Sequence, residues 1–495
     1  MHSRWRLVLA LLAGLVHTAA FAPTGLWWLQ ILALAGLVRL ARDATPGQAA
    51  ALGAFFGVGW LASGMWWLYI SMHDFGNIPA LAAALAVLLL AIFLSSYYAA
   101  ALALTAWIGR VFGRSLGHFR IAVFTAAWLL AELARATFFS GFPWGASGYA
   151  HSVGPLAVWA PWIGVYGIAA LAAACAAALA SAPSKSLTAM VLIVAAGALL
   201  PQNLTTSTGT LRVSLLQPNV PQDQKFDQAL IDANLDRLAA QIESAQGQVV
   251  VTPESVAPLP LTYLDPAYIA RLKRASLARP LLLGTFMGDE EHGFVNSLVA
   301  IDGSGGTQPY DYGKRHLLPF GEFVPTGFHW FVRLMGIPME DQAYGQHQRA
   351  FAVAGQRLRP LICYEDLFGE DIVSSVVGPD AATVFVNASN LAWFGVLMVQ
   401  DQHLQFSQMR ALEFQRPVVR ATNTGATAVV DYRGHITARL PAATVGVLES
   451  TVEGRMGSTP YARWLASYGL WPLWASAIGL LLGVLSVAFW RRRAS

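Results

Sequence analysis

Two long stretches of the chain carry almost no charged residue. Between Ala44 and Trp107 the only formal charge is Asp74, and between Ala136 and Pro201 the only one is Lys185. A helix needs about 20 consecutive apolar residues to cross a hydrocarbon layer roughly 30 Å thick. The pattern predicts eight membrane-spanning helices, over Leu7–Phe21, Leu26–Leu40, Gln48–Met72, Pro79–Trp107, Ile121–Phe138, Pro155–Ala182, Leu187–Leu200 and Tyr468–Trp490.

The basic residues near these spans predict an orientation. With eight spans they all fall on one side of the membrane, and they are Arg4, Arg6, Arg39, Arg42, Arg110, Arg114, Arg120, Lys185 and Arg491 to Arg493. The loops on the other side, near Ala22, at His73–Ile78 and at Ser140–Gly154, contain no Lys or Arg. Because Lys and Arg accumulate on the cytoplasmic side, both termini are expected in the cytoplasm. The first span also resembles a cleaved signal peptide, but its removal would leave seven spans, and the charge pattern favours eight.

Glu132 and Arg135 are an exception to the apolar character of the fifth span. They stand three residues apart, so they share one face of a helix. Charges at membrane depth are usually paired or functional. An ion pair that holds the helices together is the favoured interpretation, ahead of a direct role with substrate.

From about Leu211 to Arg455 the pattern changes to short apolar runs between charged and turn residues. Strands are predicted at Leu211–Leu216, Val249–Thr252, Leu281–Phe286, Phe294–Ile301, Leu361–Tyr364, Thr383–Val386, Val418–Thr422 and Ala426–Asp431, with helices at Gln228–Gln246 and Gln402–Gln415. Strands interleaved with helices indicate an α/β or α+β domain. The predicted organisation is a membrane domain over residues 1–205, a globular domain outside the cytoplasm over 206–460, and a last membrane helix with a basic tail over 461–495.

Composition agrees with a membrane protein and excludes some functions. Hydrophobic residues make up 55% and charged residues 12% of the 495 residues, against roughly 25% charged in soluble domains. The net charge of +4 comes largely from basic residues beside spans, so no nucleic-acid partner is expected. The chain has neither a phosphate-binding loop nor a His/Cys ligand cluster, so no cofactor and no metal are expected.

Three groups with catalytic potential follow predicted strands or lie in loops rich in Gly and Pro. Glu254 comes directly after the run Val249–Thr252, Lys314 and Glu322 share a loop, and Cys363 ends a strand. An activated thiol needs a base that accepts its proton and a cation that stabilises negative charge. Glu254, Lys314 and Cys363 supply these three roles if the fold brings them together.

The chain has only two cysteines, and they lie in different environments. Cys175 falls within an apolar span and is interpreted as a core residue. Cys363 falls in the domain outside the cytoplasm, where an unpaired thiol is buried or used. Taken alone, Cys363 would be an inert core residue at least as readily as a nucleophile.

At these residues the sequence resembles the carbon–nitrogen hydrolase (nitrilase) superfamily, whose Glu-Lys-Cys triad occupies three such motifs. Along the whole chain it resembles one branch, the apolipoprotein N-acyltransferase family. The motifs that carry the resemblance are Phe21-Ala-Pro23, Gly141 to Trp144 with Gly148-Tyr149, Gly164 to Gly167, Phe320 to Pro325, Asn387 to Asn390, Trp393 to Gly395, Met409 to Glu413 and Arg420 to Asn423.

The resemblance implies a four-layer α-β-β-α sandwich on an eight-helix bundle in the bacterial cytoplasmic membrane, with the sandwich in the periplasm. It implies transfer of an sn-1 acyl chain from a phospholipid, usually phosphatidylethanolamine, to Cys363 as a thioester, and then to the N-terminal amine of a diacylglyceryl-cysteine lipoprotein. Carried over, Glu254 is the general base, Lys314 stabilises the oxyanion, and Glu322, Tyr364 and Glu365 support the site. A monomer is the expected oligomeric state.

Some positions depart from the family pattern. Thr252 and Phe226 stand where Trp is common, and Leu391 with Val396–Asp401 replaces a more polar segment. Altered lipid contacts are expected there, with the chemistry kept. Possible contacts with substrate or lipid are Trp144, Phe226, Asn390 and Trp393. The aromatic loops Phe138–Trp144 and Phe328–Trp330 either line an acyl groove or lie at the membrane interface, and His316 and His403 are interpreted as structural.

Two alternatives stay open. A membrane-tethered amidase or nitrilase would use the same triad with water as the acceptor. A transporter or lipoprotein-binding scaffold would carry a catalytically inactive outer domain. The several spans favour a lipid substrate, because anchoring alone needs a single helix.

Overall fold

The computed structural model describes residues 2–113, 119–181, 183–302, 310–327, 329–330 and 341–494. The chain forms two compact units. One comprises Met1–Tyr69, Ala80–Asn203 and Thr459–Ser495, and the other comprises Ile70–Pro79 and Leu204–Ser458. We call them the helical unit and the sandwich unit.

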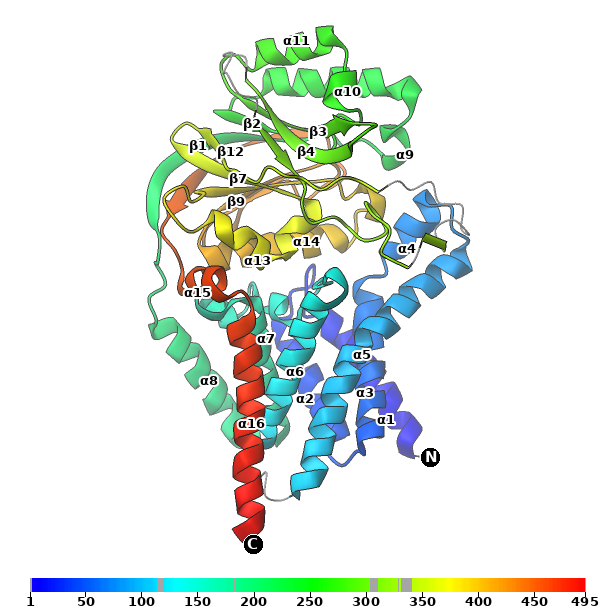
Figure 1. The fold of residues 1–495 in the computed structure, drawn as a ribbon, viewed down its shortest axis with the longest axis vertical. Coiled ribbons are helices and arrows are strands. Elements are labelled where there is room, and N and C mark those ends of the chain that lie inside the picture. The colour runs from blue at the N-terminus through cyan, green and yellow to red at the C-terminus, as the bar shows by residue number, and fades with distance from the viewer. Residues whose placement is uncertain are drawn as a thin grey trace. The chain divides into compact units, whose positions relative to one another are not determined.

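The helical unit consists of helices, and one covers most of each stretch predicted to span the membrane (Figure 1). The long helices are α1 (His2–Thr18), α2 (Trp27–Ala41), α3 (Pro46–Gly64), α5 (Ala80–Phe112), α6 (Phe119–Thr137), α7 (Ala160–Ser181), α8 (Pro183–Leu199) and α16 (Trp471–Ala494). Shorter elements are the 3-10 helices Phe138–Ser140, Ser147–His151 and Pro155–Trp159, and the helix α15 (Pro460–Tyr468).

Length and apolar character divide these helices into two groups. Within the described residues, four helices are long and apolar enough to cross a membrane, and a fifth span results if the bent pair Pro46–Gly64 and Leu68–Phe75 counts as one. The pair bends by 63°. Trp27–Ala41 and Ser186–Leu199 are apolar but shorter. The structure therefore supports four to five apolar helices as candidate spans.

The predicted ion pair of the fifth span is confirmed. Arg135 Nη2 lies 3.3 Å from Glu132 Oε2, and both side chains are fully buried. Glu132 Oε1 also accepts hydrogen bonds from the Tyr98 hydroxyl at 3.1 Å and from the Ser147 amide at 3.3 Å. Since each charged group has a partner, the pair is compatible with an apolar environment. Cys175 is buried in α7, as predicted for a core residue.

The sandwich unit is built on two six-stranded sheets. The first has the order β12-β1-β2-β3-β4-β5 and the second β11-β10-β9-β8-β7-β6. The strands of the first are β1 (Thr206–Gln217), β2 (Val249–Val251), β3 (Leu281–Asp289), β4 (Gly293–Ile301), β5 (Asp311–Gly313) and β12 (Gly446–Met456). Those of the second are β6 (Phe351–Val353), β7 (Gln356–Ile362), β8 (Val384–Ser389), β9 (Val418–Thr422), β10 (Ala428–Val430) and β11 (Ile436–Arg439).

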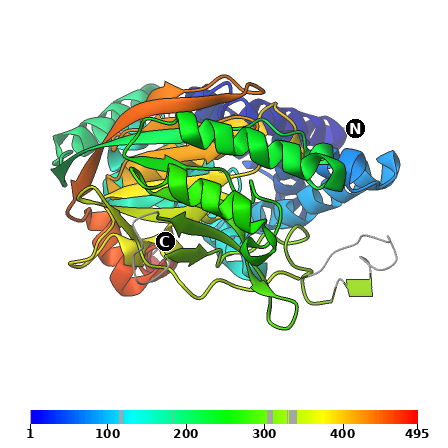
Figure 2. The same ribbon diagram turned by 90° about the horizontal axis from the view of Figure 1, so that it is seen from above.

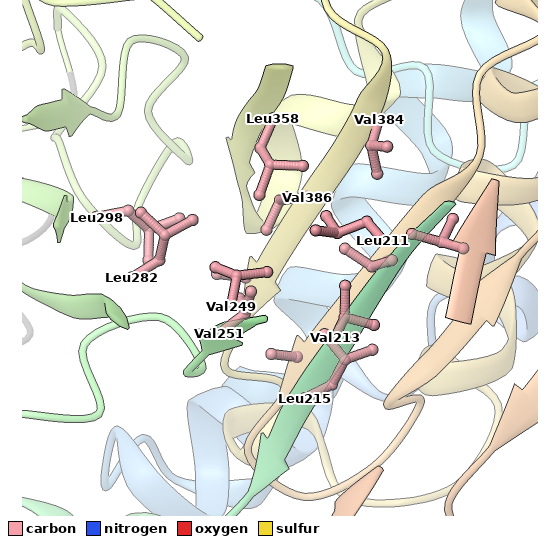
Figure 3. Packing of buried hydrophobic residues seen from close by; sticks show 14 of the residues in the cluster. Leu211, Val213, Leu215, Val249, Val251, Leu282, Leu298, Leu358, Val384 and Val386 are labelled. Atoms are coloured by element: carbon pink, nitrogen blue, oxygen red, sulfur yellow. The ribbon is translucent and has the colours of Figure 1, made fainter. Parts of the chain in front are cut away.

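A continuous apolar core contains side chains from both sheets. Alternate residues of β1, Leu211, Val213 and Leu215, are fully buried and belong to one cluster with Leu358 of β7 and Val386 of β8 (Figure 3). Successive side chains of a strand point to opposite faces, so this alternation gives each sheet one face for the shared core. The core fixes the strands that carry the candidate catalytic residues.

Helices cover the other face of the first sheet. The helices α10 (Gln228–Ser244) and α11 (Pro266–Ala275) lie over this sheet (Figure 2). Apolar residues of α10 recur at helical spacing and are buried, among them Leu235, Leu238 and Ile242. The Asp227 carboxylate accepts a hydrogen bond from the Ala229 amide at 2.9 Å and caps the start of the helix.

Helical segments also follow or pack against the second sheet. The 3-10 helix η7 (Cys363–Leu367) and the short helix α13 (Gly369–Ile372) follow β7, and the helix α14 (Val399–Phe414) contacts β9 and β10. The Phe414 ring of α14 meets the Phe385 ring of β8 edge to face at 6.0 Å. Each of the eight predicted strands overlaps an observed one, whereas β5, β6, β11 and β12 were not predicted. The predicted strand Leu361–Tyr364 shares only Leu361 and Ile362 with β7, because η7 begins at Cys363.

Candidate active site

Glu254, Lys314 and Cys363 each lie just beyond the end of a strand. Glu254 follows β2 and Lys314 follows β5, both in the first sheet, and Cys363 follows β7 in the second. Glu254 and Lys314 are buried, and Cys363 is half-buried and packs against the core shared by the two sheets. The two sheets therefore carry different members of the predicted Glu-Lys-Cys triad.

The turn at Cys363 has an unusual backbone. Cys363 has φ +52°, a value that residues other than glycine adopt rarely, and η7 begins at this residue. The Cys363 carbonyl accepts a hydrogen bond from Asn387 Nδ2 at 3.2 Å. Such strand-to-helix turns project a side chain at the end of a sheet, and backbone outliers of this kind cluster at functional sites.

Hydrogen bonds hold the Glu254 carboxylate at both oxygens. Its Oε1 accepts from Asn296 Nδ2 at 2.7 Å and from Lys314 Nζ at 3.3 Å, and its Oε2 accepts from the Asn390 amide at 2.9 Å. The preceding loop packs tightly on β3, because a Cβ at Gly284 would overlap the carbonyl oxygen of Pro253. Glu254 is therefore fixed in place by neighbours from three segments.

Lys314 lies between two carboxylates. Its Nζ donates to Glu322 Oε1 at 2.7 Å as well as to Glu254. Glu322 Oε2 accepts from the Leu318 amide at 2.8 Å. Glu322 thus orients the ammonium group that neutralises part of the charge of Glu254.

The environment shifts the pKa of the Lys314 ammonium group, the Glu322 carboxyl group and the Cys363 thiol. Burial alone would lower the pKa of Lys314, but the charges of Glu254, Glu322 and Cys363 outweigh it and raise this pKa well above its usual value. Burial also raises the pKa of Glu322, against the opposing effect of Lys314. Burial, followed by the negative charge of Glu254, raises the pKa of the Cys363 thiol well above its usual value. At neutral pH the resting site therefore holds a charged lysine and a neutral thiol, which needs a base to react.

Glu365 links the Cys363 turn to the Lys314 loop. Its Oε2 accepts from the Ile362 amide at 2.7 Å and from the Tyr312 hydroxyl at 2.7 Å, and its Oε1 accepts from the Arg315 amide at 2.8 Å. Tyr364 is also buried, and its ring packs edge to face against Phe368 at 5.1 Å. Tyr364 and Glu365, the two residues that follow Cys363, therefore have structural contacts of their own.

Behind the Cys363 turn lies a fully buried polar cluster. Asp366 Oδ2 accepts from Arg420 Nη1 at 3.0 Å and from the Ser407 hydroxyl at 2.7 Å. Arg420 Nη2 lies 2.5 Å from His403 Nδ1. Desolvation and the charge of Arg420 lower the pKa of His403 well below its usual value. A neutral His403 that orients Arg420 agrees with its structural interpretation, and His316 pairs with Asp371 at 2.9 Å.

Two residues of the site were missed by the sequence analysis. Asn296, within β4, donates Nδ2 to Glu254 and also to Glu322 Oε1, at 3.2 Å. Lys225, in the short helix α9 (Gln222–Lys225), is buried and donates to the Ser255 hydroxyl at 2.7 Å. Neither lies in a strand-end motif. For Lys225, the one feature of the sequence that could have drawn attention to it is the rarity of lysine, of which the chain has four.

The predicted substrate contacts lie in different settings. Phe226 and Trp393 are exposed by 48% and 37%, and the Trp393 ring meets Phe75 at 5.8 Å. Asn390 is buried, and its side chain bonds to Gln222 at 2.9 Å and to Asn423 at 3.0 Å. Their contact with substrate stays a prediction.

The residues of the two predicted aromatic loops differ in exposure. Trp144 belongs to the helical unit and is buried against Trp67, with ring centroids 4.7 Å apart. Phe138 and Phe139 are exposed. In the other predicted loop Trp330 is exposed, and Phe328 lies outside the described residues. Whether these side chains line a groove stays a prediction.

The site combines the elements of acyl transfer through a thiol. A carboxylate, an ammonium group and a thiol are the types of group that serve as base, oxyanion stabiliser and nucleophile in such reactions. Proteins of known family resemble both units of the chain. Residues 13–178 match the sequence model of the apolipoprotein N-acyltransferase N-terminal domain. Residues 212–461 match that of carbon–nitrogen hydrolase, so this part of the chain belongs to the carbon–nitrogen hydrolase class.

Relatives identify the branch. The chain is 44% identical to an apolipoprotein N-acyltransferase of Verminephrobacter eiseniae, over 94% of both chains. It is 45% identical to one of Ralstonia nicotianae, over 93% of this chain and 90% of the relative. A solved carbon–nitrogen hydrolase superfamily structure from Xanthomonas campestris is similar at 19% identity and a TM-score of 0.39, over 53% of this chain and 96% of that one. The chain belongs to the apolipoprotein N-acyltransferase family.

Proposed function

We propose that this protein transfers an acyl chain from a phospholipid to the N-terminal amine of a diacylglyceryl-cysteine lipoprotein, through a thioester on Cys363. The observation that carries the proposal is the buried cluster of Glu254 and Lys314 beside the Cys363 turn, in a chain similar to N-acyltransferases along nearly its whole length.

In the first half-reaction Cys363 Sγ attacks the ester carbonyl carbon of the phospholipid, and Glu254 takes the thiol proton. Lys314 stabilises the negative charge that develops on the carbonyl oxygen. The bond from the carbonyl carbon to the glycerol oxygen then breaks. That oxygen takes the proton from Glu254, a lysophospholipid leaves, and the acyl chain stays on Cys363 as a thioester.

In the second half-reaction the lipoprotein amine attacks the thioester carbonyl, and Glu254 accepts a proton from the nitrogen. The carbon–sulfur bond breaks and the proton returns to Cys363. The overall reaction needs no energy from a nucleotide, because the amide formed in the second step is more stable than both the ester and the thioester. Glu322 supports the reaction by orienting Lys314, and Glu365 does so by fixing the turn that carries Cys363.

The proposal includes the cellular arrangement. Eight membrane spans, with both termini in the cytoplasm, would place residues 206–460 in the periplasm of a bacterium as a four-layer α-β-β-α domain. Four to five long apolar helices and the loops without Lys or Arg support this arrangement. Phosphatidylethanolamine is the proposed donor, and both substrates would reach the site from the membrane.

The test is a reaction with both substrates. Purified full-length protein in detergent is incubated with phosphatidylethanolamine labelled in its sn-1 chain and with a synthetic diacylglyceryl-cysteine peptide. The proposal predicts an N-acylated peptide and one lysophospholipid for each acyl chain transferred. A hydrolase would release labelled free fatty acid and leave the peptide unmodified, and a scaffold would leave both substrates unchanged. Cys363→Ala is the matched control, and Cys175→Ala should keep full activity.

A further inference from the structure

Lys225 is the second lysine buried at the site. The chain has four lysines, and three of them lie in the sandwich unit, at positions 225, 273 and 314. Lys273 is exposed on α11, whereas Lys225 is as thoroughly buried as Lys314. Lysine is almost never fully buried unless it has a partner, and buried lysines are candidates for a functional role.

The contacts of Lys225 differ from those of Lys314. Its ammonium group donates to the Ser255 hydroxyl at 2.7 Å and lies 3.4 Å from the Glu254 carbonyl oxygen. Neither acceptor is charged. Ser255 has φ +44°, so the turn that carries Glu254 has a conformation unusual for serine. Lys225 therefore holds this turn through the Ser255 hydroxyl and the Glu254 carbonyl oxygen, whereas other residues hold the Glu254 carboxylate.

A cavity lies beside Lys225 and Glu254. Asn234 of α10 and Asn423 line it as well, together with apolar side chains such as Val256. Burial lowers the pKa of Lys225, whereas the negative charge of Glu254 and that of an ionised Cys363 raise it. The ammonium group thus lies at the turn that carries Glu254, and its charge favours an ionised Cys363.

The charges of the site show why a second cation is useful. Glu254 and Glu322 together carry two negative charges, and Lys314 compensates one of them. When Cys363 loses its proton to Glu254, the negative charge moves to the sulfur. A cation next to the sulfur lowers the free energy of this thiolate. Lys314 is shared between two carboxylates, whereas the hydrogen bonds of Lys225 go to neutral acceptors.

We propose that Lys225 is a positioning residue for the reaction: it holds the turn that carries Glu254 and supplies the second positive charge that stabilises the Cys363 thiolate. The proposal rests on the proposed function, since it assigns Lys225 to the same acyl transfer. It predicts that loss of the charge at position 225 slows every step in which Cys363 acts as a nucleophile.

The test measures the nucleophilicity of Cys363 directly. Full-length protein with Cys175→Ala, so that Cys363 is the single thiol, is alkylated with iodoacetamide, and the rate is followed by mass spectrometry. Lys225→Met removes the charge and keeps a side chain of similar length. Lys273→Met is the matched control at an exposed lysine. Since alkylation needs no phospholipid, its result bears on Lys225 whatever the acyl donor is, and acyl transfer is measured separately.

The pH dependence separates an electrostatic role from a structural one. Burial lowers the pKa of Lys225 to about 8, so the wild-type residue is charged near neutral pH and neutral well above it. At about pH 7 the K225M variant should react about tenfold more slowly than wild type, the effect of one pKa unit. The ratio of the two rates should shrink toward one at about pH 9.5, where Lys225 is neutral in wild type as well.

A ratio that is the same at both pH values, or no larger than that of the Lys273→Met control, would overturn the proposal. Lys225→Arg decides the case if the methionine variant does not fold, which its thermal unfolding midpoint reveals. Arginine stays charged at both pH values, so this variant should gain on wild type as the pH rises. An arginine variant with the pH profile of wild type would equally contradict the role of the charge.

Discussion

The Asn296 side chain offers a sharp test of how Glu254, the proposed general base, is held. Its Nδ2 is the donor to Glu254 Oε1 at 2.7 Å and to Glu322 Oε1 at 3.2 Å, and the residue is only 3% exposed. Asn296→Ala deletes this donor and leaves the backbone, whose carbonyl accepts from the Lys314 amide at 2.8 Å. The substitution therefore changes the support of the two carboxylates without changing either of them.

The magnitude follows from the two hydrogen bonds. A hydrogen bond to a charged group contributes about 1.5–3 kcal/mol. The bond to Glu322 is long, so the pair together is worth roughly 3 kcal/mol. Lys314 can compensate part of the loss by moving toward Glu254. If about half of the lost hydrogen-bond energy raises the activation free energy of acyl-enzyme formation, the reaction slows by about tenfold. If nearly all of it does, the reaction slows by about a hundredfold.

A single-turnover assay measures this rate. Purified protein is mixed with an excess of fluorescent phospholipid, and the acyl-enzyme is quantified after rapid quenching. Ser297→Ala is the control on the same strand, because its hydroxyl donates to the nearby Val295 carbonyl at 2.9 Å and, among the described residues, to neither carboxylate. If N296A forms the acyl-enzyme within about twofold of wild type, Asn296 does not hold Glu254 in the way its geometry suggests.

The remaining substitutions test the framework around the site. Glu365→Gln replaces one of the carboxylate oxygens around the Ile362 amide by an NH₂ donor, so we expect a loss of about 1–3 kcal/mol in the free energy of unfolding and slower alkylation of Cys363. Thermal unfolding and thiol labelling measure the two effects. An unchanged unfolding midpoint together with an unchanged alkylation rate would rule the expectation out. Glu132→Gln leaves Arg135 buried without its counter-charge, which should destabilise the helical unit by about 3–5 kcal/mol. Unfolding in detergent measures this loss, and the double variant with Arg135→Met should recover part of it; no recovery would contradict the pairing.

The sequence predicts the framework of the site because the chemistry follows strand ends. Glu254 follows the apolar run Val249–Val251, which is a strand in the structure. Cys363 follows the strand Gln356–Ile362, of which the sequence showed only the apolar end, because Arg357 and Arg359 interrupt the rest. The apolar helices are equally visible, since membrane burial requires long runs without charge. Short strands such as β5, with three residues, are too brief to produce a pattern.

Other parts depend on tertiary contacts that leave no local signal. The strand β12 pairs with β1 along most of its length, but Glu449 and Glu453 interrupt its apolar pattern. Asn296 is one polar residue within a strand, and only the fold shows that it points at two carboxylates. Lys225 lies in a polar helix of four residues, where a solvated lysine would be the ordinary expectation.

The most direct test of the central claim is the mass of Cys363 after exposure to phospholipid. Wild-type protein is incubated with phosphatidylethanolamine in the absence of an acceptor peptide, digested, and analysed by mass spectrometry. The account predicts that the peptide with Cys363 gains the mass of one acyl chain, and that hydroxylamine or a diacylated acceptor peptide removes it. A Cys363 peptide without any adduct, in a preparation that acylates the acceptor peptide, would contradict the thioester mechanism.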